Sequence, residues 1–432
     1  MRLTLCTAAV ALALLSPHAL AMPPEEAAAW REDLHFMASA MERTHKNLYH
    51  SISRDEFAAM VSALDTKIPG LERHEVIVGM ARIVAAVGDG HTNIYPTRDP
   101  KIGFRALPVA FTFFDGQLYV RAAHESQRQL VGSRVVRIGD RGVDEAYAAA
   151  KAIVGRDNEQ GARYWAPYLL AMPEVLHALR LTSSLDDVPI TVATSSGETT
   201  VTLHPIGPVE IMSGDIATTF ARREGWIDSR DAATSPEPLW LRRGSEAFHL
   251  EHAGKLLYLQ VNTVGNTKAE SLEQFARRVR SEIAATNPEK VAIDLRLNRG
   301  GDGTLLVPFI RALIQSQSVD CKGRLFAIIG PATFSAAQMF VDDLEKYTNV
   351  TFVGEPTGSK GNAYGDSRKI VLPRSGVTVR ASIYYWQGWH PRDERDATMP
   401  QIVAPMTFDA YRDNRDPALE AITAAPGPPC TP

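Results

Sequence analysis

The sequence predicts an α/β protein whose C-terminal half is built around a mainly parallel sheet. From about residue 246 onward, short apolar segments typical of buried strands alternate with amphipathic segments of helical periodicity. This alternation is typical of parallel sheets covered by helices. Upstream, residues 24–100 have helical periodicity, and residues 103–205 combine alternating apolar positions with the turn signals of β-hairpins. The pattern predicts three differently built regions in one chain.

Length and composition agree with a folded protein of several domains. The chain has 432 residues, of which 45% are hydrophobic and 22% charged. That length exceeds one ordinary domain. The predicted division is a helical region (22–102), a β-rich module (103–205), a linker (206–245) and the parallel-sheet core (246–425). The formal net charge is −4 without a long basic run, which argues against nucleic-acid binding.

The first 21 residues have the pattern of a cleaved secretory signal. One arginine precedes an apolar run from Leu3 to Leu15, and Ala19-Leu20-Ala21 has the small-x-small pattern of a cleavage site. The run is too short to span a bilayer, and no other run approaches the ~20 residues that a span requires. We therefore expect a periplasmic or secreted protein without a membrane span.

Two cysteines, Cys321 and Cys430, follow the predicted signal. In an oxidising compartment they either form a disulfide or remain separate thiols, and the sequence leaves both alternatives open. They do not form a zinc site, because no histidine lies at ligand spacing from them. The sequence predicts no metal and no organic cofactor.

The helical region is predicted to contain three helices. The first carries an apolar stripe at helical spacing in residues 30–41, and Ser53 with Glu56 forms a capping box for the second. The third runs from about Glu72 to Val87 and ends at Gly88.

In the β-rich module, alternating segments on either side of Asp115-Gly116 predict a hairpin. A second hairpin is predicted over residues 188–206.

In the core, each strand is followed by a turn and then a helix. The predicted strands are residues 255–261, 290–298, 324–330 and 350–354, and the helices are 271–287, 304–315 and 335–347. The carboxyl ends of parallel strands share one edge of a sheet, where ligands and active sites gather. Side chains and glycines that follow these strands are therefore the first candidates for a functional site.

Ser335 begins the last of these helices, in the segment "ATFSAAQMF". One interpretation is an N-cap serine, which is common at this position. The other is a nucleophile, because the unpaired N–H groups and partial positive charge of a helix N-terminus stabilise an oxyanion beside it. The serine alone does not decide between them.

Other segments supply partners for a nucleophile. Gly300 and Gly301 follow a buried strand, so one of them can offer an N–H to an oxyanion, with Ala336 supplying another. His91 lies on the glycine-rich loop "GDGHT" and is a candidate general base. Lys360 is an alternative base, since a desolvated lysine can deprotonate a serine. Taken alone, each has an ordinary alternative: a tight turn, an exposed histidine or a solvated lysine.

Taken in order, these motifs resemble one family. They are Asp89-Gly90-His91-Thr92, Asp294-Leu295-Arg296 through Gly300-Gly301, Thr333-Phe334-Ser335-Ala336-Ala337, Gly354-Glu355-Pro356-Thr357-Gly358, Tyr364-Gly365-Asp366 and Leu372-Pro373-Arg374-Ser375-Gly376. The ordered set resembles the tail-specific, or carboxy-terminal-processing, serine peptidase family, which includes the tricorn core protease. The resemblance covers about residues 70–425 and is greatest over 290–405.

The resemblance implies a crotonase-like (ClpP-like) catalytic core, with 103–205 as a degenerate PDZ-like module. It also implies two catalytic alternatives. Lys360 matches the base of the lysine branch, but the glutamine usual four residues later is Tyr364 here. His91 and Glu394 match the base and orienting acid of the tricorn-like branch, which we favour. Asp393 is the alternative acid.

The expected activity is hydrolysis of peptides or unfolded proteins through an acyl-enzyme on Ser335. A non-catalytic peptide-binding protein of the same fold is the alternative from another functional class. An acyl-CoA enzyme is a further alternative, but the predicted export argues against it. The sequence does not indicate cleavage specificity or oligomeric state.

Overall fold

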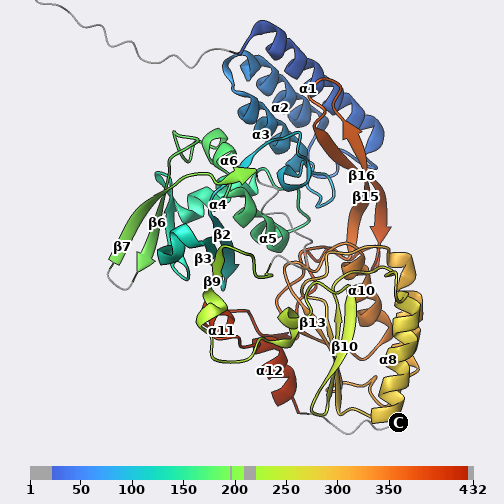
Figure 1. Ribbon diagram of the computed structural model, residues 1–432. Coiled ribbons are helices and arrows are strands. Elements are labelled where there is room, and N and C mark those ends of the chain that lie inside the picture. The colour runs from blue at the N-terminus through green and yellow to red at the C-terminus, as the bar shows by residue number, and fades with distance from the viewer. Residues whose placement is uncertain (1–21, 195–196, 209–219, 427–432) are drawn as a thin grey trace, which may run out of the picture.

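A computed structural model describes residues 22–194, 197–208 and 220–426. Figure 1 shows a mixed α/β protein in which a group of helices, a β-rich module and a parallel-sheet core lie side by side. The predicted signal segment 1–21 and Cys430 lie outside the described residues. Cys321 is disulfide-bonded. No helix of the described ranges is both long enough and apolar enough to cross a bilayer.

Three helices open the chain, as the sequence predicts: α1 (Pro24–Thr44), α2 (Arg54–Lys67) and α3 (Arg73–Ala85). The Ser53 side chain accepts a hydrogen bond from the Glu56 amide, completing the predicted capping box. Helix α3 is apolar around most of its surface and is buried on most of it, because it lies between the other helices and the β-rich module.

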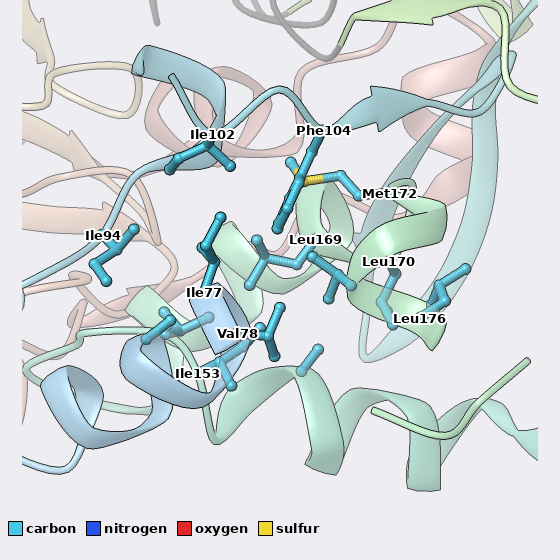
Figure 2. Packing of buried hydrophobic residues seen from close by; sticks show 14 of the residues in the cluster. Ile77, Val78, Ile94, Ile102, Phe104, Ile153, Leu169, Leu170, Met172 and Leu176 are labelled. Atoms are coloured by element: carbon cyan, nitrogen blue, oxygen red, sulfur yellow. The ribbon is translucent and has the colours of Figure 1, made fainter. Parts of the chain in front are cut away.

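Figure 2 shows how α3 joins that module through one continuous apolar core. Ile77 and Val78 of α3 lie among side chains from the following loop and from two helices of the module. These are Ile94, Ile102, Phe104, Ile153, Leu169, Leu170, Met172 and Leu176. Most of them are fully buried, so the helical region and the β-rich module fold against each other.

The β-rich module is an antiparallel sheet in the order β2-β3-β4-β6-β7. Its strands are β2 (Val109–Phe114), β3 (Gln117–His124), β4 (Arg134–Ile138), β6 (Val188–Thr194) and β7 (Gly197–Leu203). Both predicted hairpins, β2–β3 and β6–β7, are present. Between β4 and β6 the chain forms α4 (Val143–Lys151), α5 (Glu159–Leu169) and α6 (Pro173–Ala178).

The predicted linker contains ordered elements. Strand β9 (Trp226–Asp228) pairs with β3, and the short helix α7 (Leu239–Arg242) follows it. Asp228 is buried and receives hydrogen bonds from Arg121 and Tyr411. The segment is therefore tied both to the β-rich module and to the end of the chain. Our division into domains stays a prediction.

The core is a six-stranded sheet in the order β10-β11-β12-β13-β14-β17. All neighbouring pairs are parallel except β10–β11. The strands are β10 (Phe248–Ala253), β11 (Leu256–Val261), β12 (Lys290–Asp294), β13 (Leu325–Ile329), β14 (Thr351–Gly354) and β17 (Ile402–Val403). The parallel arrangement follows the strand–helix alternation of the sequence.

Helices cover both faces of this sheet. On one face lie α8 (Leu272–Thr286), α9 (Val307–Ile314) and α10 (Ala336–Tyr347). The other face is covered by α12 (Pro417–Ala424), with Leu239 of α7. Along β11 the side chains alternate between the faces: Leu257 and Leu259 contact the first layer, and Tyr258 the second.

One element of the predicted core extends away from it. The long hairpin of β15 (Asn362–Val371) and β16 (Thr378–Gln387) reaches from the sheet toward α1 (Figure 1). Its far end packs into the core of the helical region through Ile370, Val379 and Ala381. Its Arg380 pairs with Asn93 as an isolated bridge. The hairpin thus fixes the loop after α3 against the parallel-sheet core.

Candidate active site

Ser335 lies at the turn between β13 and α10 with a backbone conformation that is rare for a residue with a side chain. Its φ is 58° and its ψ is −127°. Such a conformation costs energy and persists where the surroundings enforce it. Here the Phe334 amide donates to the Asn298 carbonyl (3.1 Å), and Thr333 Oγ1 donates to the Leu295 carbonyl (3.0 Å). The Ser335 side chain makes no capping hydrogen bond, so it does not act as the N-cap that was one interpretation.

The glycine turn after β12 lies directly beside this serine. A Cβ at Gly300 would lie 2.7 Å from the Ser335 Cβ, and a Cβ at Gly301 only 2.0 Å from the Val264 carbonyl oxygen. Both residues have positive φ, 108° and 139°, so glycine is required on two counts. The Gly300 amide already donates to Asn298 Oδ1 (2.8 Å).

The amides of Gly301 and Ala336 are the two that stay available. Within the described ranges neither donates a hydrogen bond, and both residues line the same pocket as Ser335. Ala336 is the first residue of α10, where amides have no partner inside the helix. Of the predicted donors, the structure therefore leaves Gly301 rather than Gly300 free to bind an oxyanion.

His91 reaches the serine from the loop that follows α3. Its Nε2 lies 3.0 Å from Ser335 Oγ. Its ring stacks on that of Phe334, with centroids 4.5 Å apart. A neutral imidazole with its proton on Nδ1 accepts the serine hydroxyl proton at Nε2. Nδ1 is buried and has no hydrogen-bond partner in the part of the chain described.

The histidine loop is held by the buried carboxylate of Asp89. Its Oδ1 accepts from the amides of His91 (2.9 Å) and Thr92 (2.8 Å) and from Ser382 Oγ (2.7 Å). Its Oδ2 accepts from His45 Nε2 (2.8 Å). Burial raises the pKa of Asp89, but these hydrogen bonds outweigh it and hold the pKa well below the usual range. Asp89 is thus a charged anchor that connects α1, β16 and the loop.

A second buried acid, Asp157, also binds the histidine loop. It belongs to the segment between α4 and α5, and its carboxylate accepts from the Gly90 amide (2.7 Å) and from Ser359 Oγ (2.6 Å). Burial raises its pKa, and the charge that His91 can carry is the largest effect that lowers it. Asp157 and His91 therefore interact electrostatically, and a charged imidazole favours the ionised form of the carboxyl group.

Two predicted residues are not hydrogen-bonded to the Ser335–His91 pair. Lys360 lines the pocket, but its Nζ lies 3.0 Å from Asp396 Oδ1. Glu394 is exposed in the turn after β16 and does not line the pocket. Its neighbour Asp393 pairs with Arg395. The roles predicted for Lys360 and Glu394 stay predictions.

The pocket beside Ser335 has a volume of about 310 Å³. His91, Gly301 and Ala336 line it, together with residues of α10 and β15. A larger cavity of about 610 Å³ lies between β2, α5 and the carboxyl end of β13. Neither Ser335 nor His91 lines the larger cavity, so the chemistry belongs to the smaller one.

His45, His50 and Asp89 are the one group of potential metal ligands within the described residues. The hydrogen bonds favour another explanation for this group. The Asn47 amide donates to His45 Nδ1 (3.0 Å), so a neutral His45 carries its proton on Nε2, directed at Asp89. A metal ligand at that position needs a free lone pair instead. The arrangement fits a hydrogen-bonded support for the His91 loop.

Comparison with solved structures shows that the fold of this chain is similar to that of CPAF. CPAF complexed with lactacystin matches with a TM-score of 0.60 and 12% sequence identity, over 92% of this chain and 97% of that chain. Mature CPAF matches with a TM-score of 0.59 and 13% identity, over 92% and 96%. The photosystem II D1 C-terminal processing protease matches with a TM-score of 0.38 and 14% identity, over 92% and 99%. No protein-family model matches the sequence, and no curated protein matches it.

Sequence reasoning missed Asp157 altogether. It lies in "GRDNEQG", which has no catalytic pattern, and its partners are 67 and 202 positions away. The only local signal is Asn158, which caps α5 and thereby marks Asp157 as the residue before a helix start. That signal indicates a turn, but it does not indicate a buried carboxylate that binds the histidine loop.

Proposed function

We propose that this protein is an exported serine-type peptidase that hydrolyses peptide bonds of peptides or unfolded proteins through an acyl-enzyme on Ser335. One observation carries the proposal: the 3.0 Å contact between Ser335 Oγ and His91 Nε2, made beside the unpaired amides of Gly301 in the glycine turn and of Ala336 at the start of α10. Nucleophile, base and oxyanion donors are the parts that acyl transfer needs. The resemblance of the sequence motifs to tail-specific peptidases supports the same reaction.

The steps follow from these positions. Ser335 Oγ attacks the peptide carbonyl while His91 Nε2 takes the hydroxyl proton, and the Gly301 and Ala336 amides bind the oxyanion. His91 gives the proton to the leaving amine as the C–N bond breaks. Water, deprotonated by His91, then attacks the ester and releases the carboxylate and the Ser335 hydroxyl. Asp157 stabilises the imidazolium that forms in each half of the reaction.

The test is the reaction of Ser335 in the folded protein. A fluorophosphonate, which reacts with activated serines, is expected to label wild-type protein at Ser335 and not Ser335→Ala. Hydrolysis of an unfolded protein such as casein is expected to be lost in the same variant, while its circular dichroism stays unchanged. Hydrolysis at the wild-type rate by Ser335→Ala would refute the proposal. Absence of label on wild type, with peptide binding retained, would favour the non-catalytic alternative.

The proposed export is tested separately. Fractionation of cells that express the full chain is expected to recover a mature form, beginning near Met22, from the periplasm or the medium. Recovery of the uncut chain from the cytoplasm would contradict export without affecting the proposed chemistry.

A further inference from the structure

Helix α10 carries two polar side chains into the pocket that Ser335 lines. Gln338 and Asp342 follow the serine by three and seven positions, and both line the pocket. Residues with this spacing share one face of a helix. The helical rise places Asp342 about 10 Å from Ser335 along the axis. A long side chain that ends in a hydrogen-bond donor covers that length.

Two oxygen atoms on this face have no hydrogen-bond donor. Gln338 Nε2 donates to Asp342 Oδ1 (2.9 Å) and to Thr398 Oγ1 (2.9 Å), which fixes the direction of the amide. Gln338 Oε1 and Asp342 Oδ2 are then left buried without a partner in the described residues. Buried acceptors of this kind are rare and costly. A ligand that supplies donors to these two oxygen atoms would remove that cost.

The remaining charges of the pocket are mostly negative. Asp302 and Asp366 are exposed and line the same pocket. Lys360 also lines it, but its charge is paired with Asp396. A cation entering the pocket therefore meets three carboxyl groups, whereas an acidic side chain would be repelled.

We propose that this pocket selects a lysine or arginine side chain on the substrate residue whose carbonyl Ser335 attacks. The substrate cation supplies the donors that Gln338 Oε1 and Asp342 Oδ2 lack, and Asp302 and Asp366 attract it at the entrance. A carboxylate at the end of the pocket beside the nucleophile is an established means of selecting basic residues. This inference rests on the proposed function and adds the substrate class.

The ionisation of Asp342 is compatible with this role. Burial raises its pKa to about 7, while the hydrogen bond from Gln338 and the charge of Lys346 act in the opposite direction. A bound cation favours the ionised carboxylate. The site therefore gains its full negative charge when a basic side chain is in place.

The decisive measurement compares two peptide diphenyl phosphonates on the wild-type protein. They differ only in the residue attached to phosphorus, which is lysine in one and leucine in the other. The lysine compound is expected to inactivate at least about tenfold faster, as a charge-assisted hydrogen bond implies. Equal rates, or a faster leucine compound, would refute the inference and leave the proposed function standing. Labelling by a small fluorophosphonate but by neither peptide compound would also refute it. If neither peptide compound nor the fluorophosphonate reacts, the proposed function fails, and this inference fails with it.

Two variants locate the selectivity in the pocket. Asp342→Asn keeps the shape of the side chain, and the lysine-to-leucine ratio of inactivation rates is expected to fall about 10- to 100-fold. Asp343→Asn is the matched control, because Asp343 is the next residue on α10 and does not line the pocket. Its ratio is expected to equal that of wild type. An unchanged ratio in a folded Asp342→Asn protein would refute the assignment.

Discussion

His91 Nε2 lies 3.0 Å from Ser335 Oγ, although 244 positions separate the two residues in the sequence. The contact depends on the β15–β16 hairpin, which connects the two regions. Near its far end the hairpin pairs with Asn93 of the histidine loop, and at its other end Tyr364 lines the pocket. The base and the nucleophile thus belong to regions with different cores. Their alignment requires that the two regions remain docked.

The first prediction identifies the base. His91→Ala is expected to lower kcat/KM by roughly 10²–10⁴-fold, the usual contribution of a general base. Lys360→Ala is expected to change kcat/KM by less than about threefold. Lys360 pairs with Asp396, so this variant loses only one exposed ion pair. Steady-state hydrolysis of one peptide by both variants provides the comparison. A larger loss in Lys360→Ala than in His91→Ala would reverse the assignment.

The second prediction concerns Asp157 as a positioning residue. Asp157→Asn keeps the size of the side chain but removes the negative charge near His91. A loss of roughly 10- to 100-fold in kcat/KM is expected, as for a lost interaction with a charged group. The imidazolium form also loses its buried counter-charge, so the acidic limb of the pH–rate profile is expected to move to lower pH.

The shift of the acidic limb of the pH–rate profile distinguishes an electrostatic role of Asp157 from a structural one. A merely structural role would lower activity at every pH and leave the shape of the profile unchanged. Asp144→Asn, an exposed acid in the first turn of the neighbouring helix α4, is the control and is expected to retain both the rate and the profile of wild type.

The third prediction concerns the glycine turn. Gly301→Ala adds a Cβ that would lie 2.0 Å from the Val264 carbonyl oxygen, at a φ of 139°. The turn must move, and its amide moves with it. We expect a loss of about 10²–10³-fold in kcat, the usual effect of losing one oxyanion donor. Gly265→Ala is the control, since its added Cβ meets only ordinary contacts. Activity of Gly301→Ala near the wild-type level would exclude this amide from the site.

The fourth prediction concerns stability and pH. Asp89→Ala leaves His45 and two loop amides without their acceptor, so the free energy of unfolding is expected to fall by about 3–5 kcal/mol. Because the folded-state pKa of Asp89 is depressed, its contribution is fully present above the usual aspartate pKa. That contribution is lost as the pH falls below this value toward the folded pKa.

Urea denaturation of wild type and variant at pH 7 and pH 3 measures both parts of this prediction. The difference between the two proteins is expected to be smaller at pH 3 than at pH 7. The exposed Asp140 provides the control variant Asp140→Ala, expected to change stability by less than about 0.5 kcal/mol at either pH. A difference for Asp89→Ala that is constant across this range would contradict the proposed anchor.

Part of the fold could be predicted because local patterns determine it. The alternation of strands and helices fixed the parallel sheet, and the capping box at Ser53 gave the start of α2. The strand–turn–helix context of Ser335 gave its position at the carboxyl edge of the sheet. The hairpin over residues 362–387 could not be placed in the same way. Neither of its strands is among the predicted ones, and the helical region against which it packs lies about 300 positions earlier in the chain.

The sequence by itself determined the residue types that the chemistry requires: a serine at a helix start, a histidine on a glycine-rich loop and a glycine pair after a buried strand. Each of these follows from local backbone geometry. The tertiary structure alone decided which groups meet. Docking of the hairpin and of the α4–α5 segment brings His91 to Ser335 and the Asp157 carboxylate to the Gly90 amide of the histidine loop. These relations depend on packing between distant segments, which no local pattern encodes.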